Sequence, residues 1–279
     1  MITKNEEQEQ KLAYMKQDME IAKRMSKIKH KIAVMSGKGG VGKSTMAVNM
    51  AVALSKKGYR TGILDVDIHG PNVPRMLKIG KKDILADKDG ILPVKVGENL
   101  KVISAQFLLS DENSPIIWRG PRKTAAIRQF LGDVSWGDLD ILIVDCPPGT
   151  GDEHLTILQS IPFLDGIVMV TTPHLVSLDD VEKSINMAKQ LKIRVLGIIE
   201  NMSGMICPKC ETEIPLFGNG GGAEIASKTQ IPLLGSIPIY VEPKGEKNRL
   251  LIENNESEAS KKMLGIVEKL EDLIMKKEE

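Results

Sequence analysis

The stretch "MSGKGGVGKST", Met35–Thr45, places four glycines and two lysines in eleven residues. Its central part, Gly37–Ser44, fits the pattern G-x-x-x-x-G-K-[ST]; an apolar run, Ile32–Met35, precedes it, and a segment with helical periodicity, Lys43–Lys57, follows it. A strand before this pattern and a helix after it are the context in which it forms a phosphate-binding loop. Glycines allow consecutive backbone N–H groups to face one anion, and the positive end of the following helix adds to the attraction. The stretch therefore predicts a nucleoside triphosphate site.

The side chains of this loop have distinct predicted roles. We expect Lys43 to reach the β- and γ-phosphates, and the Ser44 hydroxyl to bind Mg²⁺. Lys38 is a second lysine at the start of the loop, where it could supply the mobile cation that an arginine finger supplies elsewhere. The alternative is that Lys38 is a surface lysine without a catalytic role. The predicted nucleotide contacts are Gly37, Lys38, Gly39, Gly40, Val41, Gly42, Lys43, Ser44 and Thr45.

Strand-like and helix-like segments alternate along most of the chain. The predicted strands are Ile32–Met35, Thr61–Asp65, Leu100–Ser104, Asp140–Val144, Gly166–Thr171, Val195–Glu200 and Leu233–Ile237. The predicted helices include Lys43–Lys57, Lys123–Leu131, Leu178–Gln190 and Lys261–Lys276. Most of these strands are continuously apolar, which is typical of strands covered on both faces. The alternation predicts an α/β fold with a doubly wound, mainly parallel sheet flanked by helices.

The domain organisation follows from composition. Residues 1–29 are rich in Lys, Glu and Gln and are expected to form a charged helix or arm. Apolar residues recur there at helical spacing, so that one face could dock on a surface, although a solvated tail explains the composition equally well. These apolar residues are Leu12, Met15, Met19, Ala22 and Met25. Residues 30–279 are expected to form a single domain, because no segment resembles a linker between domains.

Composition and charge narrow the classes of partner. The chain of 279 residues is 42% hydrophobic but only 3% aromatic, so it can bury a large core that is mainly aliphatic. Its formal net charge is +1 and no basic stripe is present, which argues against nucleic acid as the main ligand. We find no signal-peptide pattern and no apolar run long enough to cross a bilayer, and expect a cytoplasmic protein without membrane attachment.

Carboxylates follow two of the predicted strands, where nucleotide sites form in open α/β sheets. Asp65 and Asp67 lie in "ILDVDIHGPNVP", and Asp145 ends the run "ILIVD". An aspartate after four apolar residues is the Walker B arrangement, which binds Mg²⁺ directly or through water. We predict that Asp145 and Asp67 are linked to Mg²⁺ and that Asp67 orients the attacking water. Asp152 could instead cap the helix that begins near Glu153.

Two of the three cysteines form the motif Cys207-Pro208-Lys209-Cys210, in a predicted loop within residues 204–222. Two thiolates at this spacing can bind one metal ion or one cluster, but a complete site needs four ligands. A twofold-symmetric dimer would bring two such pairs together. Zn²⁺ remains an alternative to an iron–sulfur cluster, and a redox disulfide a third reading. The glycine run Gly218–Gly222 is expected to be a flexible turn that leaves this loop mobile.

Several long motifs occur in one order: "GKGGVGKST", "DVDIHGPNVP", "WRGP", "LDILIVDCPPGTGDEHLT", "ENMSGMICPKC" and "LFGNGGG". Together they resemble the Mrp/ApbC family of iron–sulfur cluster carriers, which are ATPases of the MinD-like class, over residues 28–245. The resemblance implies ATP hydrolysis, a [4Fe–4S] cluster that bridges a homodimer through Cys207 and Cys210, and transfer of this cluster to apo iron–sulfur proteins. It implies that Lys38 crosses the dimer interface to the partner's nucleotide, and that Asn201 contacts adenine.

The sequence departs from this family at two positions. Cys146 and Asn72 stand where relatives usually have an apolar residue and a serine. The extra cysteine cluster or assembly domain that some relatives carry before the ATPase domain is not present in these residues, so we expect a compact form. Two other functions remain open at this stage: a surface-partitioning ATPase of the MinD/ParA type, and an ATPase that inserts nickel or zinc. The charges on the predicted helix Lys261–Lys276 balance, which favours its packing on the domain over attachment to anionic lipid.

Overall fold

The computed structural model describes residues 4–68, 70–80, 83–108, 120–207, 210, 212–218, 220–239, 250–254 and 257–275. Some residues of the predicted motifs and of the last predicted helix lie outside these ranges: His69, Trp118, Arg119, Pro208, Lys209, Asn219 and Lys276. The helices are α1 (Lys4–Met25), α2 (Lys43–Lys56), α3 (Val73–Met76), α4 (Gly120–Asp133), α5 (Asp152–Ser160), α6 (Leu175–Gln190), α7 (Gly221–Thr229) and α8 (Glu258–Met275). Two 3₁₀ turns span Ala105–Leu108 and Leu251–Glu253.

The strands build one large sheet and one small hairpin. The strands of the sheet are β1 (Ile28–Ser36), β2 (Thr61–Asp65), β5 (Val94–Val96), β6 (Leu100–Ser104), β7 (Leu139–Asp145), β8 (Gly166–Thr171), β9 (Val195–Ile206), β10 (Glu213–Ile214) and β11 (Leu233–Ile239). Their order is β10-β9-β8-β1-β7-β2-β6-β5, and β11 also pairs with β9. The pairs of β5 with β6 and of β10 with β9 are antiparallel, and the others are parallel. The predicted doubly wound, mainly parallel sheet is confirmed.

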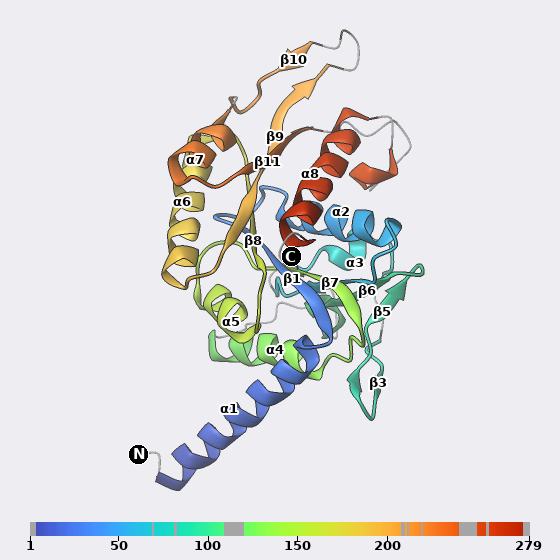
Figure 1. Ribbon diagram of the computed structural model, residues 1–279, viewed down its shortest axis with the longest axis vertical. Coiled ribbons are helices and arrows are strands. Elements are labelled where there is room, and N and C mark those ends of the chain that lie inside the picture. The colour runs from blue at the N-terminus through green and yellow to red at the C-terminus, as the bar shows by residue number, and fades with distance from the viewer. Residues whose placement is uncertain are drawn as a thin grey trace.

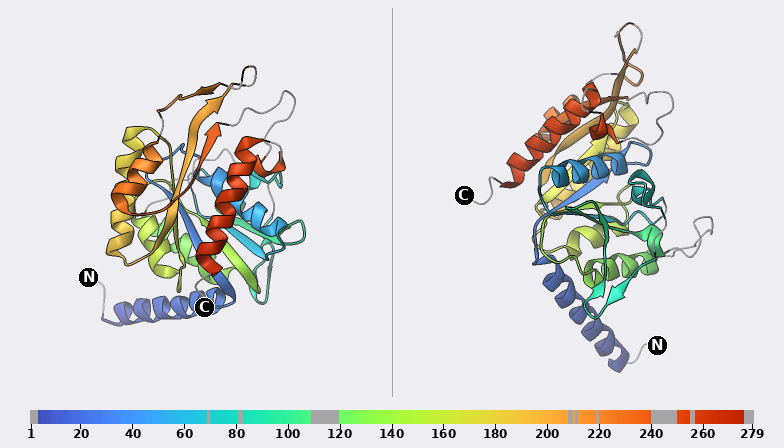
Figure 2. Two further views of the ribbon diagram at one scale, coloured as in Figure 1. Left: turned by 45° about the horizontal axis from the view of Figure 1, so that its top comes forward. Right: turned by 90° about the vertical axis from the view of Figure 1, so that its right-hand side faces the viewer.

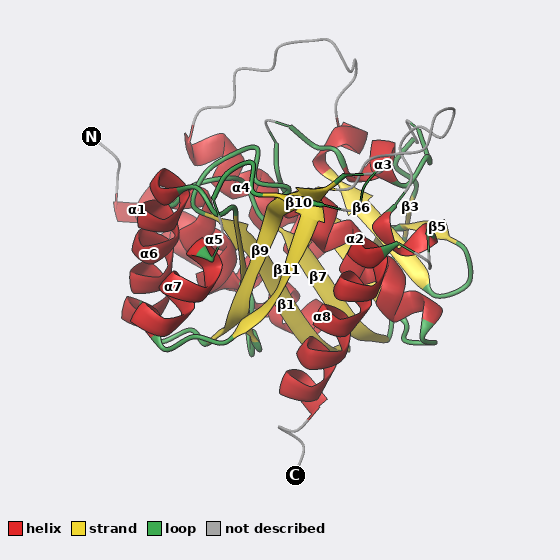
Figure 3. Cartoon of the chain, turned by 90° about the horizontal axis from the view of Figure 1, so that it is seen from above, coloured by secondary structure: helices red, strands yellow, loops and turns green. Residues whose placement is uncertain are grey.

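Helices cover both faces of the sheet, and each face has its own apolar core (Figure 3). Alternate residues of β1 show the arrangement, because Ala33 and Met35 belong to the core under α1, α4, α5, α6 and α7, whereas Ile32 and Val34 belong to the core under α2 and α8. A parallel strand between two helical layers has no solvent-facing side, so all four residues are apolar. This layering holds the ends of β1, β2 and β7 rigidly at one edge.

The small hairpin pairs β3 (Ala86–Asp87) with β4 (Gly90–Ile91). Lys88 and Asp89 form its turn, and Gly90, the first residue of β4, has a φ of 124°, a region that favours glycine. The hairpin lies within the sequence "ILADKDGILPV", Ile84–Val94.

The N-terminal helix α1 packs mainly through its C-terminal end. Ile21 and Met25 are buried in the core beneath α4, and β1 already begins at Ile28. Arg128 of α4 ties the middle of α1 to the body, because its guanidinium donates hydrogen bonds to Gln17 and Asp18 and lies 5.4 Å from the centre of the Tyr14 ring. Of the two alternatives for this segment, a docking face holds for its C-terminal end, whereas Leu12, Met15 and Met19 are exposed.

Candidate functional site

The glycine-rich loop joins β1 to α2, as predicted. Gly40 and Gly42 have φ angles of 80° and 86°, in the left-handed region that glycine adopts without strain. Gly42 is the N-cap of α2 and no side chain caps the helix, so the N–H groups of the first turn are available to an anion. A methyl group on Gly42 would lie 2.2 Å from the Asn201 side-chain nitrogen. Both backbone conformation and space therefore require glycine at this position.

A buried ion pair occupies the floor of the site. The Lys43 ammonium donates a hydrogen bond of 2.6 Å to Asp145, whose side chain is fully buried, and lies 3.8 Å from Asp67. Burial alone would lower the pKa of Lys43, but the two carboxylates outweigh it and the pKa is raised. Burial raises the pKa of Asp145, and the lysine ammonium opposes that shift. Without a nucleotide, Lys43 is thus held as a cation by the carboxylates that were predicted to bind Mg²⁺.

Asp65 organises the neighbouring loop, a role that the sequence analysis missed. It pairs in register with Asp145 across β2 and β7, and its carboxylate accepts hydrogen bonds from the Ser104 hydroxyl at 2.8 Å and from the backbone N–H of Asp67 at 3.2 Å. Complete burial, together with the nearby Asp145, raises the pKa of Asp65 to about 8. The first aspartate of "DVD" therefore holds the second in place. The available signal was its position inside the apolar run, which predicts a buried carboxyl.

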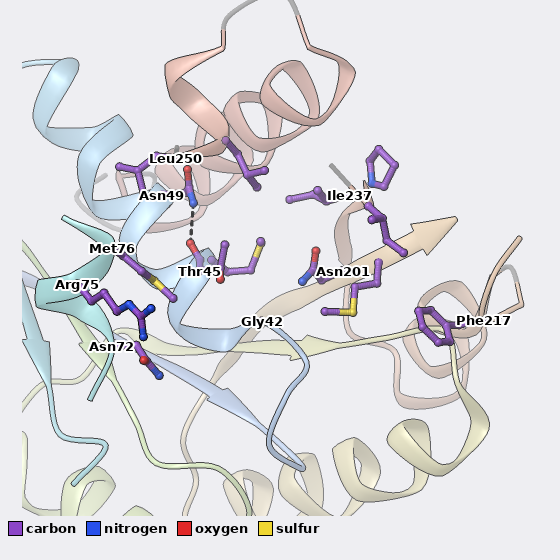
Figure 4. Close-up of a pocket in the computed structure, with 15 residues that line it drawn as sticks. Gly42, Thr45, Asn49, Asn72, Arg75, Met76, Asn201, Phe217, Ile237 and Leu250 are labelled. Carbon is purple, nitrogen blue, oxygen red and sulfur yellow. Dashed lines mark hydrogen bonds between the residues drawn. The ribbon is translucent and has the colours of Figure 1, made fainter. Parts of the chain in front are cut away.

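Two adjoining pockets open above this floor, of which Figure 4 shows the larger. The smaller, about 340 Å³, is lined by the phosphate loop, Asp67 and Pro148. The larger, about 610 Å³, continues from Gly42 and Thr45 to apolar side chains and Asn201. The sizes and linings suit a polyphosphate in the first pocket and a nucleoside in the second. The Asn201 amide donates a 2.9 Å hydrogen bond to the Val41 carbonyl, which ties the wall of the larger pocket to the phosphate loop.

Lys38 lies at the rim of the phosphate loop and is half-buried. Its carbonyl accepts a 2.9 Å hydrogen bond from the Ser36 hydroxyl, which fixes the backbone at the start of the loop. Its ammonium forms no ion pair with any other residue that the structure describes. It is therefore placed differently from Lys43, whose charge is neutralised within the same chain.

The segment after Asp145 is packed tightly against the floor. Cys146 is fully buried, and burial raises the pKa of its thiol well above the usual range, so it is an unreactive thiol beside the site. His154 is also buried, and burial lowers its pKa. Its Nε2 lies 2.8 Å from the Pro147 carbonyl oxygen, to which a neutral imidazole can donate a hydrogen bond.

Asp152 is the first residue of α5, and Gly151 is the N-cap. The predicted capping role of Asp152 is therefore wrong.

The cysteine motif lies at the tip of a β-hairpin. β9 continues beyond the predicted end at Glu200 to Ile206, and β10 returns antiparallel to it. The Cys207 N–H donates to the Thr212 carbonyl at 3.0 Å, and the Cys210 sulfur lies 3.3 Å from the Thr212 hydroxyl, whose hydrogen bond lowers the pKa of this exposed thiol. The hairpin stands out from the body, at the end of the molecule opposite α1 (Figures 1 and 2). Among the described residues, no cluster of three or more potential metal ligands occurs.

The glycine run after the hairpin differs from the flexible turn that was expected there. Gly221 and Gly222 are buried at the start of α7, where a methyl group would lie 2.6 Å from the Pro173 carbonyl oxygen and 2.8 Å from the Glu200 Cβ, respectively. The Gly222 N–H donates a hydrogen bond to Glu200, and the Ser203 hydroxyl donates a second one at 2.6 Å. These glycines are close-packing positions, and the expected flexible turn is wrong for them. Glu200, which the sequence analysis passed over, anchors the base of the hairpin to α7.

The last helix packs on the domain, as the balanced charges predicted. Its apolar stripe is buried in the core beside α2. The buried residues of this stripe are Met263, Ile266, Val267, Leu270 and Ile274. Within the part of the chain that the structure describes, we find no helix with the length and apolar character that a membrane crossing needs.

Comparisons with known proteins identify a family and relatives that match most of this chain. Residues 27–271 match the family model of the NUBPL iron-transfer P-loop NTPase, within the ParA group. The chain is 50% identical over 260 residues to an iron–sulfur cluster carrier protein of Methanocaldococcus jannaschii, with 91% of this chain and 90% of that protein covered. It is 44% identical over 260 residues to the cytosolic Fe-S cluster assembly factor Nubp2 homolog of Drosophila melanogaster, with 90% and 99% covered.

Solved structures show the same fold. A nucleotide-binding protein from Archaeoglobus fulgidus, in complex with ADP and with cobalt found in it, superposes with a TM-score of 0.71 at 39% identity, covering 91% of this chain and 93% of that one. The cell division ATPase MinD of Pyrococcus furiosus superposes with a TM-score of 0.61 at 25% identity, covering 88% and 99%.

Proposed function

We propose, because this chain belongs to the family of NUBPL iron-transfer P-loop NTPases, that it is a cytoplasmic iron–sulfur cluster carrier that binds and hydrolyses ATP. The cluster is its cargo, held between two copies of the chain and passed to apo iron–sulfur proteins. The observation that carries the proposal is that one strand, β9, serves both the nucleotide pocket and the cysteine hairpin.

The nucleotide end of the mechanism starts from the buried ion pair. An incoming ATP offers phosphate oxygens to Lys43, which then leaves Asp145 for the β- and γ-phosphates. Asp145 and the Ser44 hydroxyl, which accepts a 3.2 Å hydrogen bond from Lys43, would then be available as oxygen ligands for Mg²⁺. Asp67, 3.8 Å from the lysine, orients the attacking water, and Asp65 keeps Asp67 in place through its backbone. Exchange of one ion pair for another avoids leaving a charge buried and unpaired.

The cysteine end requires a second copy of the chain. Cys207 and Cys210 supply two thiolates, and the described part of one chain offers no further ligand beside them. A symmetric dimer in which the two hairpin tips meet supplies four, which suits a [4Fe–4S] cluster. Zn²⁺ would accept the same four thiolates, and the metal analysis below distinguishes the two.

The two sites are physically connected through the hairpin. Asn201 and Met202 of the outgoing strand line the nucleoside pocket, and so does Phe217, which follows the returning strand. Met202 has a φ of 58°, a conformation that costs a residue with a side chain about 1–2 kcal/mol. Backbone strain of this kind is concentrated at sites that switch or bind ligands. Both legs of the cysteine hairpin thus begin in the wall of the nucleotide pocket, which gives ATP a route to influence cluster release.

The cluster assignment is tested by purifying the protein without oxygen and measuring iron, sulfide and the visible spectrum. We expect about four irons per dimer in the wild type, none in the Cys207→Ala and Cys210→Ala variants, and an unchanged content in Cys146→Ala, because that thiol is buried elsewhere. ADP binding should survive in all three variants. A colourless protein that contains zinc and no iron would refute the carrier function.

The cross-subunit role of Lys38 is tested by mixing two inactive variants, Lys38→Ala and Asp67→Ala. If Lys38 acts on the partner's nucleotide, a mixed dimer has one site with both residues intact, and mixing restores ATP hydrolysis. If Lys38 acts within its own chain, every site in the mixed dimer lacks one residue and hydrolysis stays absent. Restored activity therefore supports the dimeric arrangement, and its failure in proven mixed dimers refutes it.

A further inference from the structure

Phe217 is an aromatic residue that lines the larger pocket while 45% of its surface is exposed. It lies between the cysteine hairpin and α7. Its neighbour Leu216 is exposed to a similar extent, 48%, but does not line this pocket. Figure 4 shows Phe217 at the end of the pocket opposite Arg75 and Asn72, with Asn201 between them. An exposed aromatic ring at a pocket wall has apolar surface that a ligand can cover.

The composition of the pocket indicates which part of a ligand meets this ring. Near α2 the lining contains Gly42 of the phosphate loop and the polar residues Thr45 and Asn49, beside Met46. The other wall is apolar, with side chains from β11 and the following 3₁₀ turn, including Ile237, Leu250 and Leu251. The Asn201 amide donates to the phosphate loop through its nitrogen, so its carbonyl oxygen serves as an acceptor. Apolar walls beside the amide acceptor of Asn201 suit a flat heterocycle that carries an amino group.

We propose that Phe217 stacks on the base of the bound nucleotide and closes this end of the pocket. The inference rests on the proposed binding of ATP and ADP. It adds a residue that contacts the base and that directly follows the returning strand of the cysteine hairpin. Aromatic rings stack on any base through the π-face, so this contact strengthens nucleotide binding without involving the phosphates. The loss of the ring should then affect a nucleotide but not a ligand that consists of phosphates alone.

Calorimetric titration with ADP and, separately, with inorganic pyrophosphate tests this prediction. Stacking energies of single bases on aromatic side chains predict that Phe217→Ala weakens ADP binding roughly 5- to 100-fold. Phe217→Tyr, which keeps the ring, and Leu216→Ala, the matched control on the same segment, should each stay within about twofold of the wild type. Pyrophosphate, which occupies only the phosphate loop, should bind equally to all four proteins.

Two results would overturn the inference while leaving nucleotide binding intact. One is an ADP affinity of Phe217→Ala that equals the wild type. The other is an equal loss of ADP and pyrophosphate affinity in this variant, which would show that the ring supports the pocket structurally. A wild-type protein that binds no ADP at all would refute the proposed function itself, and this inference with it.

Discussion

The ion pair between Lys43 and Asp145 makes a sharp prediction about stability. The Lys43→Met variant keeps the aliphatic stem of the lysine but removes its ammonium, which lies 2.6 Å from a carboxylate with no exposed surface. Removal of one partner of a buried pair typically costs about 3–5 kcal/mol, because the remaining charge is unpaired. Asp145 can limit this cost by taking up a proton. For a carboxyl with an unfolded pKa near 3.9, protonation at pH 7 costs about 4 kcal/mol. We therefore expect a loss of about 3–4 kcal/mol.

The pH dependence of the stability loss in Lys43→Met shows whether the unpaired charge of Asp145 causes it. In the variant, burial raises the pKa of Asp145 and no ammonium opposes it. A carboxyl whose folded pKa exceeds its unfolded value favours the folded state at low pH, and this contribution is lost as pH rises toward the folded pKa. The deficit of the variant should therefore shrink to about 1.5 kcal/mol at pH 5 and reappear at pH 7. A second substitution, Asp145→Asn, removes the charge and should recover most of the loss at pH 7.

The assay is urea unfolding followed by circular dichroism, without Mg²⁺ or nucleotide, for the wild type, both single variants and the double variant. The four free energies of unfolding form a double-mutant cycle that isolates the interaction between the two residues. Three results would each refute the reasoning: a deficit of Lys43→Met below about 1 kcal/mol at pH 7, a deficit that is equal at pH 5 and pH 7, or a double variant that is no more stable than Lys43→Met.

Two further predictions concern the phosphate loop and the last helix. In Gly42→Ala, the positive φ costs about 1–2 kcal/mol and the new methyl group displaces the Asn201 amide. Gly40→Ala has a similar φ but open space around its Cβ, so calorimetry should show a markedly greater loss of ADP affinity for Gly42→Ala; equal losses would contradict the role of Asn201. Glu271 of α8 accepts hydrogen bonds from the Lys57 ammonium and the Tyr59 hydroxyl, which follow α2. These hydrogen bonds outweigh burial and lower the pKa of Glu271. The stabilisation that the Glu271 carboxylate provides is present above its unfolded pKa near 4.5 and is lost as pH falls through the lower folded pKa. Glu271→Gln should therefore reduce the free energy of unfolding by about 0.5–1.5 kcal/mol at pH 7 and leave it unchanged at pH 2.5. Thermal unfolding measures both values. The exposed Glu268→Gln serves as its control, and an equal effect of the two substitutions would refute the claim.

Local sequence was sufficient for the central part of the fold. The strands Thr61–Asp65, Leu100–Ser104 and Gly166–Thr171 have the predicted bounds, because a strand covered on both faces is marked by a continuous apolar run that ends at polar residues. The strand–loop–helix context of Gly37–Ser44 was predictable for the same reason, together with the glycines. The roles of the individual loop residues in ATP binding and hydrolysis remain predictions.

The tertiary structure decided the features that depend on what lies beside a segment. Periodicity identified apolar residues on α1 but could not show that α4 covers only Ile21 and Met25 and leaves Met15 exposed. The strand β9 runs six residues past its predicted end, because β11 and β10 supply backbone partners that the mixed polar and apolar sequence after Glu200 does not reveal.

The same limit applies to the candidate site. The types of residue in the site could be predicted from the sequence, because the spacing of its glycines, lysines, aspartates and paired cysteines indicates phosphate and metal binding. The juxtaposition of Asp65 with Asp145 depends on the register of β2 and β7, and the glycines before α7 are packed against Glu200 rather than flexible. Short-range patterns record the conformational preferences of a few neighbouring residues, whereas pairing and burial are set by residues tens to hundreds of positions away. The chain alone therefore indicated which chemistry is present, and only the folded structure showed that the base of the cysteine hairpin lines the larger pocket.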